Sequence, residues 1–256
     1  MAEHVAFDGA AGQRLVGLLD LPDGGPAVMT ALFAHCFTCG KDSIAAARIA
    51  RALTARGFAV LRFDVTGLGE SEGTFGEATF SMDVADLSAA GGFLRARGQG
   101  PGLLVGHSLG GAAVIAAASS IPEAVAVATI GAPSDPSHVA RLLAHAVPTL
   151  EAHGRAQVQL AGRSFTVHRA FLDDLREQPQ RRRIAELGRA LLVMHSPQDT
   201  IVGIDNAREI FDAARHPKSF IGLDGADHLL TGEHDARYAA DVLAAWASRY
   251  TPAREE

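Results

Sequence analysis

Residues 103–113 read LLVGHSLGGAA, and this stretch decides how the rest of the chain is interpreted. It joins a short apolar run to a run of small helix-forming residues through Gly106, Ser108 and Gly110. A sharp strand-to-helix turn lifts a serine Oγ clear of its neighbours and leaves no room for side chains two residues away, hence both glycines. The same turn points the N–H of Leu109 toward negative charge that develops beside the serine. The sequence therefore predicts Ser108 as a nucleophile and Leu109 as one oxyanion donor.

Two later apolar runs lead into residues that can activate a serine. Residues 189–199 read RALLVMHSPQD, a strand pattern that breaks at Pro197 and leaves Asp199 in a loop. Residues 218–230 read KSFIGLDGADHLL, and His228 follows this second strand pattern. The carboxyl ends of parallel strands meet at one edge of a sheet, so these side chains can converge there. We predict His228 as the general base and Asp199 as the acid that orients it.

Asp224 and Asp227 are alternative partners for His228, because both lie close to it in sequence. Adjacent side chains diverge in extended backbone, which disfavours Asp227. Asp224 is most simply a strand-end or turn residue. Asp199 is therefore the preferred acid.

Several segments together resemble an α/β-hydrolase-fold serine esterase over the whole chain, whose triad follows the order Ser, Asp, His. More narrowly, the motifs HCFTCGKD, LRFDVTGLGESEG, GHSLGGAAV, ATIGAPSDP, VMHSPQD and LDGADHLL resemble the hydrolase fused to, or encoded with, OsmC-family peroxide reductases. The layout is also similar to small cinnamoyl-ester hydrolases whose cap bears a hairpin. The resemblance implies ester hydrolysis by Ser108, Asp199 and His228, and an OsmC-type peroxide reductase as a partner. It does not supply a substrate.

The second oxyanion donor is expected in the loop after an early strand. Residues 27–37 read AVMTALFAHCF, and by position the N–H of Phe37 takes this role. The sequence departs from the common His-Gly-X turn, because Cys36 replaces the glycine. Cys36 and Cys39 are the only cysteines and form a C-x-x-C, which is either a redox pair or two small side chains lining the loop.

Alternating strand and helix patterns predict an α/β fold with a mostly parallel sheet and helices on both faces, forming one domain over residues 1–256. A hairpin over residues 5–21 starts the chain. Ser81 is expected to cap the helix that precedes the Ser108 strand.

Residues 136–187 interrupt the alternation and predict an insertion that forms a cap. Within it, residues 157–160 and 165–168 alternate around Ala161-Gly162, which indicates a β-hairpin. We expect the apolar face of this hairpin to line the acyl pocket.

A Gly-rich segment contains Asp64, Gly67, Gly69 and Ser71 but lacks the pattern of a phosphate-binding loop. It is expected to shape the floor of the site. His107 is expected to pack or hydrogen-bond behind the Ser108 turn, and His35 to brace its own loop. Neither has metal-ligand spacing. No metal or organic cofactor is predicted.

Composition limits the classes of partner and location. The chain has 256 residues, 48% of them hydrophobic, and a net charge of −6 without a basic block, which argues against nucleic acid. Charges such as Glu3 and Asp8 argue against a signal peptide, and glycines break the uncharged stretch 98–122. We expect a cytoplasmic protein without membrane association, with a homodimer as one candidate assembly.

These observations predict a serine hydrolase for small to medium acyl or aryl esters. Thioesterase, lactonase and perhydrolase activities are compatible with the same triad. The alternative without enzymatic activity is an inactive hydrolase scaffold that binds a peroxide reductase. The intact triad argues against this alternative.

Overall fold

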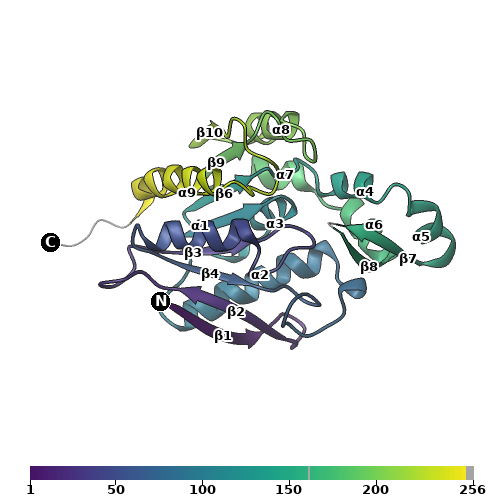
Figure 1. The fold of residues 1–256 in the computed structure, drawn as a ribbon, viewed down its shortest axis with the longest axis horizontal. Coiled ribbons are helices and arrows are strands. Elements are labelled where there is room, and N and C mark those ends of the chain that lie inside the picture. The colour runs from purple at the N-terminus through teal and green to yellow at the C-terminus, as the bar shows by residue number, and fades with distance from the viewer. Residues whose placement is uncertain (161, 252–256) are drawn as a thin grey trace.

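The computed structural model describes residues 1–160 and 162–251 and contains an eight-stranded sheet (Figure 1). The first two strands are antiparallel, the second also runs antiparallel to its other neighbour, and every later pairing is parallel. From one edge to the other the order is β1 (Ala2–Asp8), β2 (Arg14–Asp20), β4 (Phe58–Phe63), β3 (Met29–Ala34), β5 (Leu103–His107), β6 (Ala126–Ile130), β9 (Ala190–His195) and β10 (Lys218–Gly222). The predicted fold class and the hairpin at the start of the chain are confirmed.

Helices cover both faces of this sheet, and each face has its own hydrophobic core. The five central strands are buried along their whole length, as expected for a parallel sheet covered on both sides. One face packs against α1 (Ile44–Thr54) and α9 (Glu233–Ala247). The other packs against α2 (Phe80–Ala96), α3 (Leu109–Ala117) and α8 (Asp205–Ala213).

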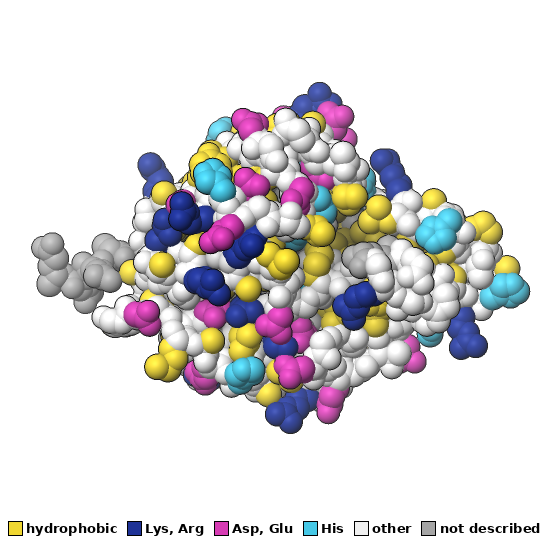
Figure 2. All heavy atoms as spheres, viewed as in Figure 1, with side chains coloured by type: hydrophobic (Ala, Val, Ile, Leu, Met, Phe, Trp, Pro, Cys, Tyr) yellow, Lys and Arg dark blue, Asp and Glu magenta, His cyan; other side chains and the backbone are white. Residues whose placement is uncertain are grey.

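The segment between β6 and β9 folds into elements of its own, at the right of Figure 1. We call residues 136–187 the cap. Its hairpin pairs β7 with β8 in antiparallel register, and Ala161 of the predicted turn lies outside the described residues. The cap elements are η3 (Pro136–His138), α4 (Val139–Leu142), α5 (Val147–His153), β7 (Arg155–Leu160), β8 (Arg163–His168), α6 (Arg169–Arg176) and α7 (Gln180–Ala185). Figure 2 shows hydrophobic side chains gathered where the cap meets the body.

The helix cap predicted at Ser81 is wrong, because α2 begins two residues earlier. Oγ1 of Thr79 accepts a hydrogen bond from the N–H of Met82 and caps the helix. Ser81 instead donates its hydroxyl to Asp174 of α6 at 2.5 Å, and its N–H donates to the same carboxylate at 2.8 Å. Ser81 thus ties the cap to the body. In the described ranges, no helix is both long and apolar enough to cross a membrane.

Candidate active site

The turn around Ser108 has the geometry that its sequence predicts. Ser108 follows β5 directly and has φ 55°, an uncommon value for a residue other than glycine. A Cβ at Gly106 would lie closer than 3.0 Å to the backbone of Gly110, and one at Gly110 would lie equally close to the backbone of Ala34. Only glycines allow these segments to approach, so the strained serine backbone is held by close packing on both sides.

The three predicted triad residues lie together. Nε2 of His228 is 3.0 Å from Oγ of Ser108, and Nδ1 of His228 is 2.6 Å from Oδ2 of Asp199. The three residues follow β5, β9 and β10, whose C-terminal ends meet at one edge of the sheet. The arrangement can pass a proton from the hydroxyl to the imidazole and stabilise the charged ring beside a carboxylate.

Asp199 is held as a buried anion. Its Oδ1 accepts hydrogen bonds from the N–H groups of Ile201 and Val202, both at 2.9 Å. Burial by itself would raise the pKa of Asp199, but the hydrogen bonds from His228 and from the backbone lower it below the usual value. The carboxylate therefore stays charged and correctly aimed when His228 becomes an imidazolium.

The two alternative acids lie elsewhere. Asp227 accepts hydrogen bonds from the N–H groups of Leu229 and Thr231, so it closes the turn after His228. Asp224 is exposed to solvent. The structure thus brings Asp199, and neither alternative, to the imidazole.

Of the two predicted oxyanion donors, Leu109 is the first residue of α3, directly after Ser108, and Phe37 lies in the loop after β3. We call residues 35–43 the oxyanion loop. Within the described chain, the N–H groups of Leu109 and Phe37 have no hydrogen-bond acceptor and are therefore free for a ligand. Cys36 and Cys39 form a disulfide across Phe37, and the N–H of Cys39 donates to the carbonyl of Cys36 at 3.0 Å. The C-x-x-C is thus a closed turn around the second donor.

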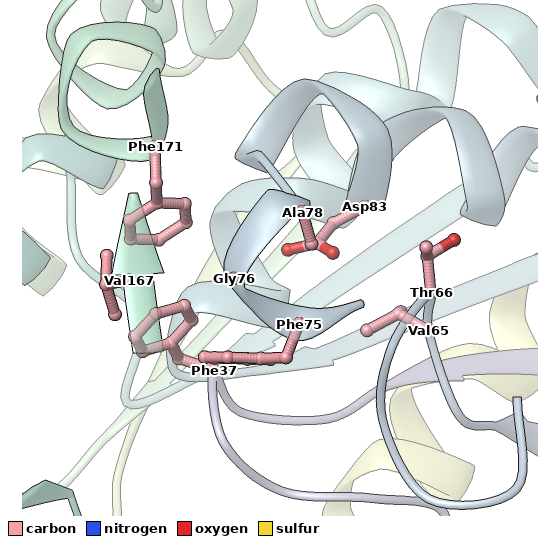
Figure 3. Close-up of a pocket in the computed structure, with 9 residues that line it drawn as sticks. All are labelled: Phe37, Val65, Thr66, Phe75, Gly76, Ala78, Asp83, Val167 and Phe171. Carbon is pink, nitrogen blue, oxygen red and sulfur yellow. The ribbon is translucent and has the colours of Figure 1, made fainter. Parts of the chain in front are cut away.

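Aromatic rings connect the oxyanion loop to the cap. The ring of Phe37 stacks on Phe171 of α6, with centroids 4.7 Å apart and planes 10° apart. It also contacts Phe75 of η1 (Phe75–Glu77) at 5.3 Å, and Phe75 contacts Phe165 of the hairpin at 4.7 Å. The rings of Phe37, Phe75 and Phe171, with Val167 of β8, border a narrow pocket (Figure 3). Val167 is the hairpin residue that borders this pocket, and that the hairpin lines an acyl pocket stays a prediction.

Asp83 is the one acidic side chain bordering this pocket. It extends from α2 toward the pocket in Figure 3 and also borders a second narrow space behind Phe37 and Leu109. Within the described chain its carboxyl group accepts no hydrogen bond. Burial, followed by the charges of Asp86 and Asp174, raises the pKa of Asp83 well above its usual value.

Three buried histidines support the loops of the site. Nε2 of His107 bonds to the carbonyl of His228 at 2.7 Å, and Nδ1 of His35 bonds to the carbonyl of Cys36 at 3.0 Å. The predicted hydrogen bond of His107 behind the Ser108 turn, here to the loop of His228, and the bracing of its own loop by His35 are confirmed. Burial, with the neighbouring His228, lowers the pKa of His107 to about 4, so the ring is neutral and its N–H serves the loop.

His195 is a third brace, which the sequence analysis missed. It ends β9, and its Nε2 bonds to the carbonyl of Val202 at 2.7 Å, so it supports the loop that presents Asp199. Burial lowers its pKa as well. The available signal was a histidine at the end of an apolar strand run, four residues before the predicted acid.

A family model described as Alpha/beta hydrolase family matches residues 31–241. The chain belongs to the alpha/beta hydrolase family. The matched residues run from β3 to α9 and include the whole triad. Among curated proteins, the search returned no matching sequence.

Solved structures place this hydrolase beside esterases. The esterase domain of a Rhodothermus marinus protein superposes with a TM-score of 0.78 at 47% identity, over 97% of this chain and 98% of that one. Est1E of Butyrivibrio proteoclasticus, with ferulic acid bound, superposes with a TM-score of 0.79 at 17% identity, over 96% of this chain and 98% of that one. A serine hydrolase without a lid from Xanthomonas campestris superposes with a TM-score of 0.69 at 21% identity, over 98% of this chain and 96% of that one. The last two likenesses show the fold alone.

Proposed function

We propose that this hydrolase cleaves carboxylic esters through an acyl-enzyme on Ser108. The observation that carries the proposal is the continuous pair of contacts from Ser108 to His228 and from His228 to Asp199, at 3.0 and 2.6 Å. The similarity to an esterase domain at 47% identity supports it.

The reaction has two halves. His228 takes the proton of Ser108 as Oγ attacks the ester carbonyl, and Asp199 stabilises the imidazolium. The N–H groups of Leu109 and Phe37 then stabilise the tetrahedral oxyanion, each by about 3 kcal/mol. The imidazolium returns its proton to the leaving alcohol. Water, activated by the same imidazole, attacks the acyl-enzyme and releases the acid.

Apolar side chains beside Phe37 support small to medium acyl or aryl groups as substrates. Phe37, a proposed oxyanion donor, borders the narrow pocket together with largely aromatic and aliphatic side chains. An acyl group whose carbonyl oxygen bonds to Phe37 therefore has apolar surface beside it. The peroxide-reductase partner and the homodimer remain predictions from the sequence.

The decisive test is hydrolysis of a graded panel of p-nitrophenyl esters, aryl esters and matched thioesters. Ser108→Ala is expected to fold and to lose about 10⁴-fold or more of the ester activity, since no acyl-enzyme forms. An alkyl phosphonate should label Ser108 and no other residue.

Ser134→Ala is the matched control, because Ser134 follows β6 near the same sheet edge but bonds to Asn206 and Glu209. It should retain activity. Faster turnover of thioesters would redefine the hydrolase as a thioesterase. A folded wild-type protein that neither hydrolyses the panel nor reacts with phosphonate would refute the proposal and favour the scaffold.

A further inference from the structure

A buried ion pair outside the triad joins two loops at the site. Nζ of Lys41 donates to Oδ2 of Asp64 at 2.8 Å, and the side chains are only 4% and 2% exposed. The N–H of Lys41 donates to Oδ1 of the same carboxylate at 2.8 Å, and the N–H of Glu70 donates to Oδ2 at 3.1 Å. Lys41 belongs to the oxyanion loop, whereas Asp64 and Glu70 belong to residues 64–71, which we call the Gly-rich loop. One carboxylate therefore fastens the two loops together.

Two glycines make this contact possible. A Cβ at Gly40 would lie 2.7 Å from Oδ1 of Asp64, and one at Gly69 would lie closer still to Oδ2. Gly69 also has φ +54°, a conformation that favours glycine. Asp64 is thus enclosed from both sides by backbone, and its position is coupled to that of both loops.

The pair is held in its charged form. Burial by itself would raise the pKa of Asp64, but hydrogen bonds from Lys41 and Glu70 lower it below the usual value. Burial would lower the pKa of Lys41, but hydrogen bonds to Asp64 and Glu70 raise it. Removing the charge of Lys41 would leave the buried Asp64 carboxylate without a cation, whereas removing that of Asp64 would leave Lys41 paired only with the exposed carboxylates of Glu70, at 2.6 Å, and Asp42, at 3.4 Å.

The oxyanion loop transmits this constraint to Phe37. Residues 36–39 form a tight turn, closed by the Cys36–Cys39 disulfide and by the hydrogen bond from the N–H of Cys39 to the carbonyl of Cys36, and Gly40 alone separates this turn from Lys41. The ring of Phe37 is fixed against Phe171. A shift at Lys41 would therefore move the backbone of Phe37 rather than be absorbed by a slack loop.

We propose that Asp64 and Lys41 are positioning residues that hold the Phe37 N–H where the oxyanion forms. This inference rests on the proposed ester hydrolysis and on Phe37 as an oxyanion donor. The Gly-rich loop then contributes to transition-state stabilisation. This is a further role, beyond shaping the floor of the site. A misplaced donor reduces the stabilisation of the transition state far more than it reduces substrate binding, because the negative charge that the donor stabilises develops only during the reaction.

The test compares Asp64→Asn with the wild type on the best ester of the panel. Asparagine keeps the size but loses the charge and one acceptor oxygen. We expect kcat to fall about 10- to 100-fold, with KM changed less than about threefold. An alkyl trifluoromethyl ketone of matched chain length forms a tetrahedral adduct on Ser108. Its Ki should rise in parallel with the loss of kcat.

Asp86→Asn is the matched control. Asp86 is as buried as Asp64, each being 1% exposed, and it accepts bonds from the N–H and hydroxyl of Thr66 in the Gly-rich loop. It has no contact with the oxyanion loop among the hydrogen bonds of the described residues. This control should lower Tm but leave kcat and the ketone Ki unchanged, so a loss of general stability is separated from donor placement.

Lys41→Met is the second variant, since it keeps most of the side-chain length without the charge. It should show the same selective loss of kcat. Folded Asp64→Asn and Lys41→Met proteins with wild-type kcat and Ki would overturn the inference, as would equal losses in Asp86→Asn. Failure of both variants to fold would also overturn it, because the pair would then be a folding requirement. An inactive, unlabelled wild type would instead refute the proposed function.

Discussion

Two buried aspartates, Asp64 and Asp199, and the half-buried Asp83 differ in how the fold treats their charge. Asp64, like the triad residue Asp199, accepts three hydrogen bonds, and its pKa is lowered. Asp83 borders the pocket, its carboxyl group has no hydrogen-bond partner in the described residues, and its pKa is raised. The fold thus stabilises the anion at two of these positions and the neutral acid at the third.

Asp64 and Asp199 hold the loops of the site in position, whereas Asp83 borders the pocket. A carboxylate with several donors holds loops in register, and its loss leaves those donors unsatisfied. An unpartnered carboxyl group lowers stability, and such costs are common where a side chain borders a binding pocket.

The largest effect is expected from weakening a paired carboxylate in the triad. Asp199→Asn should lower kcat by about 10⁴-fold, because asparagine favours the wrong imidazole tautomer and cannot stabilise the imidazolium. Steady-state hydrolysis of the best ester measures this. Asp224→Asn is the control and should stay within about threefold of wild type, since Asp224 is exposed and lies outside the triad contacts. A larger loss in Asp224→Asn than in Asp199→Asn would reverse the assignment.

Acid should unfold the protein partly through histidines that the fold keeps neutral. The pKa of His107 falls from 6.5 to about 4 on folding, so between these values only the unfolded chain binds the proton. The free energy of unfolding should therefore decrease by about 3 kcal/mol as the pH falls from 6.5 to 4. Urea unfolding at several pH values measures this decrease.

His107→Gln removes the titrating ring and should flatten the profile in that window. His35 and His195 remain in the variant and preserve part of the slope, because burial lowers the pKa of both. Equally steep profiles for the two proteins would show that His107 does not contribute to the acid sensitivity.

The residues of the triad were predictable because each lies in a local pattern. Gly106 and Gly110 are required by the backbone around Ser108, and Asp199 and His228 each follow an apolar strand. The carboxyl ends of parallel strands lie at one edge of the sheet, so the proximity of these residues follows from the fold class. Phe37 was likewise predicted as a donor from its position after an early strand.

The aromatic border of the pocket was not predictable, because its rings meet only through tertiary packing. Phe75 and Phe171 come from η1 and from the cap, and nothing in their local sequence indicates a contact with Phe37. The same reason explains the wrong cap at Ser81. Thr79 and Ser81 are both acceptable caps by residue type, and Asp174 of α6, distant in sequence, engages Ser81 instead.

The smallest effect is expected at Asp83. Replacing its carboxyl group should raise the free energy of unfolding, whereas the same replacement at Asp64 should lower it. Because the pKa of Asp83 is raised, its ionisation at neutral pH opposes folding. Asp83→Asn, a neutral side chain of similar size, should therefore raise the free energy of unfolding at pH 8 by about 1 kcal/mol. This gain should shrink as the pH falls through the raised pKa and vanish near 3.8, where the unfolded chain also becomes protonated. Urea unfolding at pH 8 and pH 4 measures both arms.

Asp64→Asn supplies the opposing control at pH 8, because it removes a paired anion and should destabilise the fold. A loss of stability in both variants at pH 8 would mean that Asp83 has a stabilising partner when ionised. The contrast between a fixed and a free carboxyl group beside Phe37 would then be wrong. Opposite signs at pH 8, with the gain of Asp83→Asn lost at pH 4, would establish that the pocket keeps a destabilising acid.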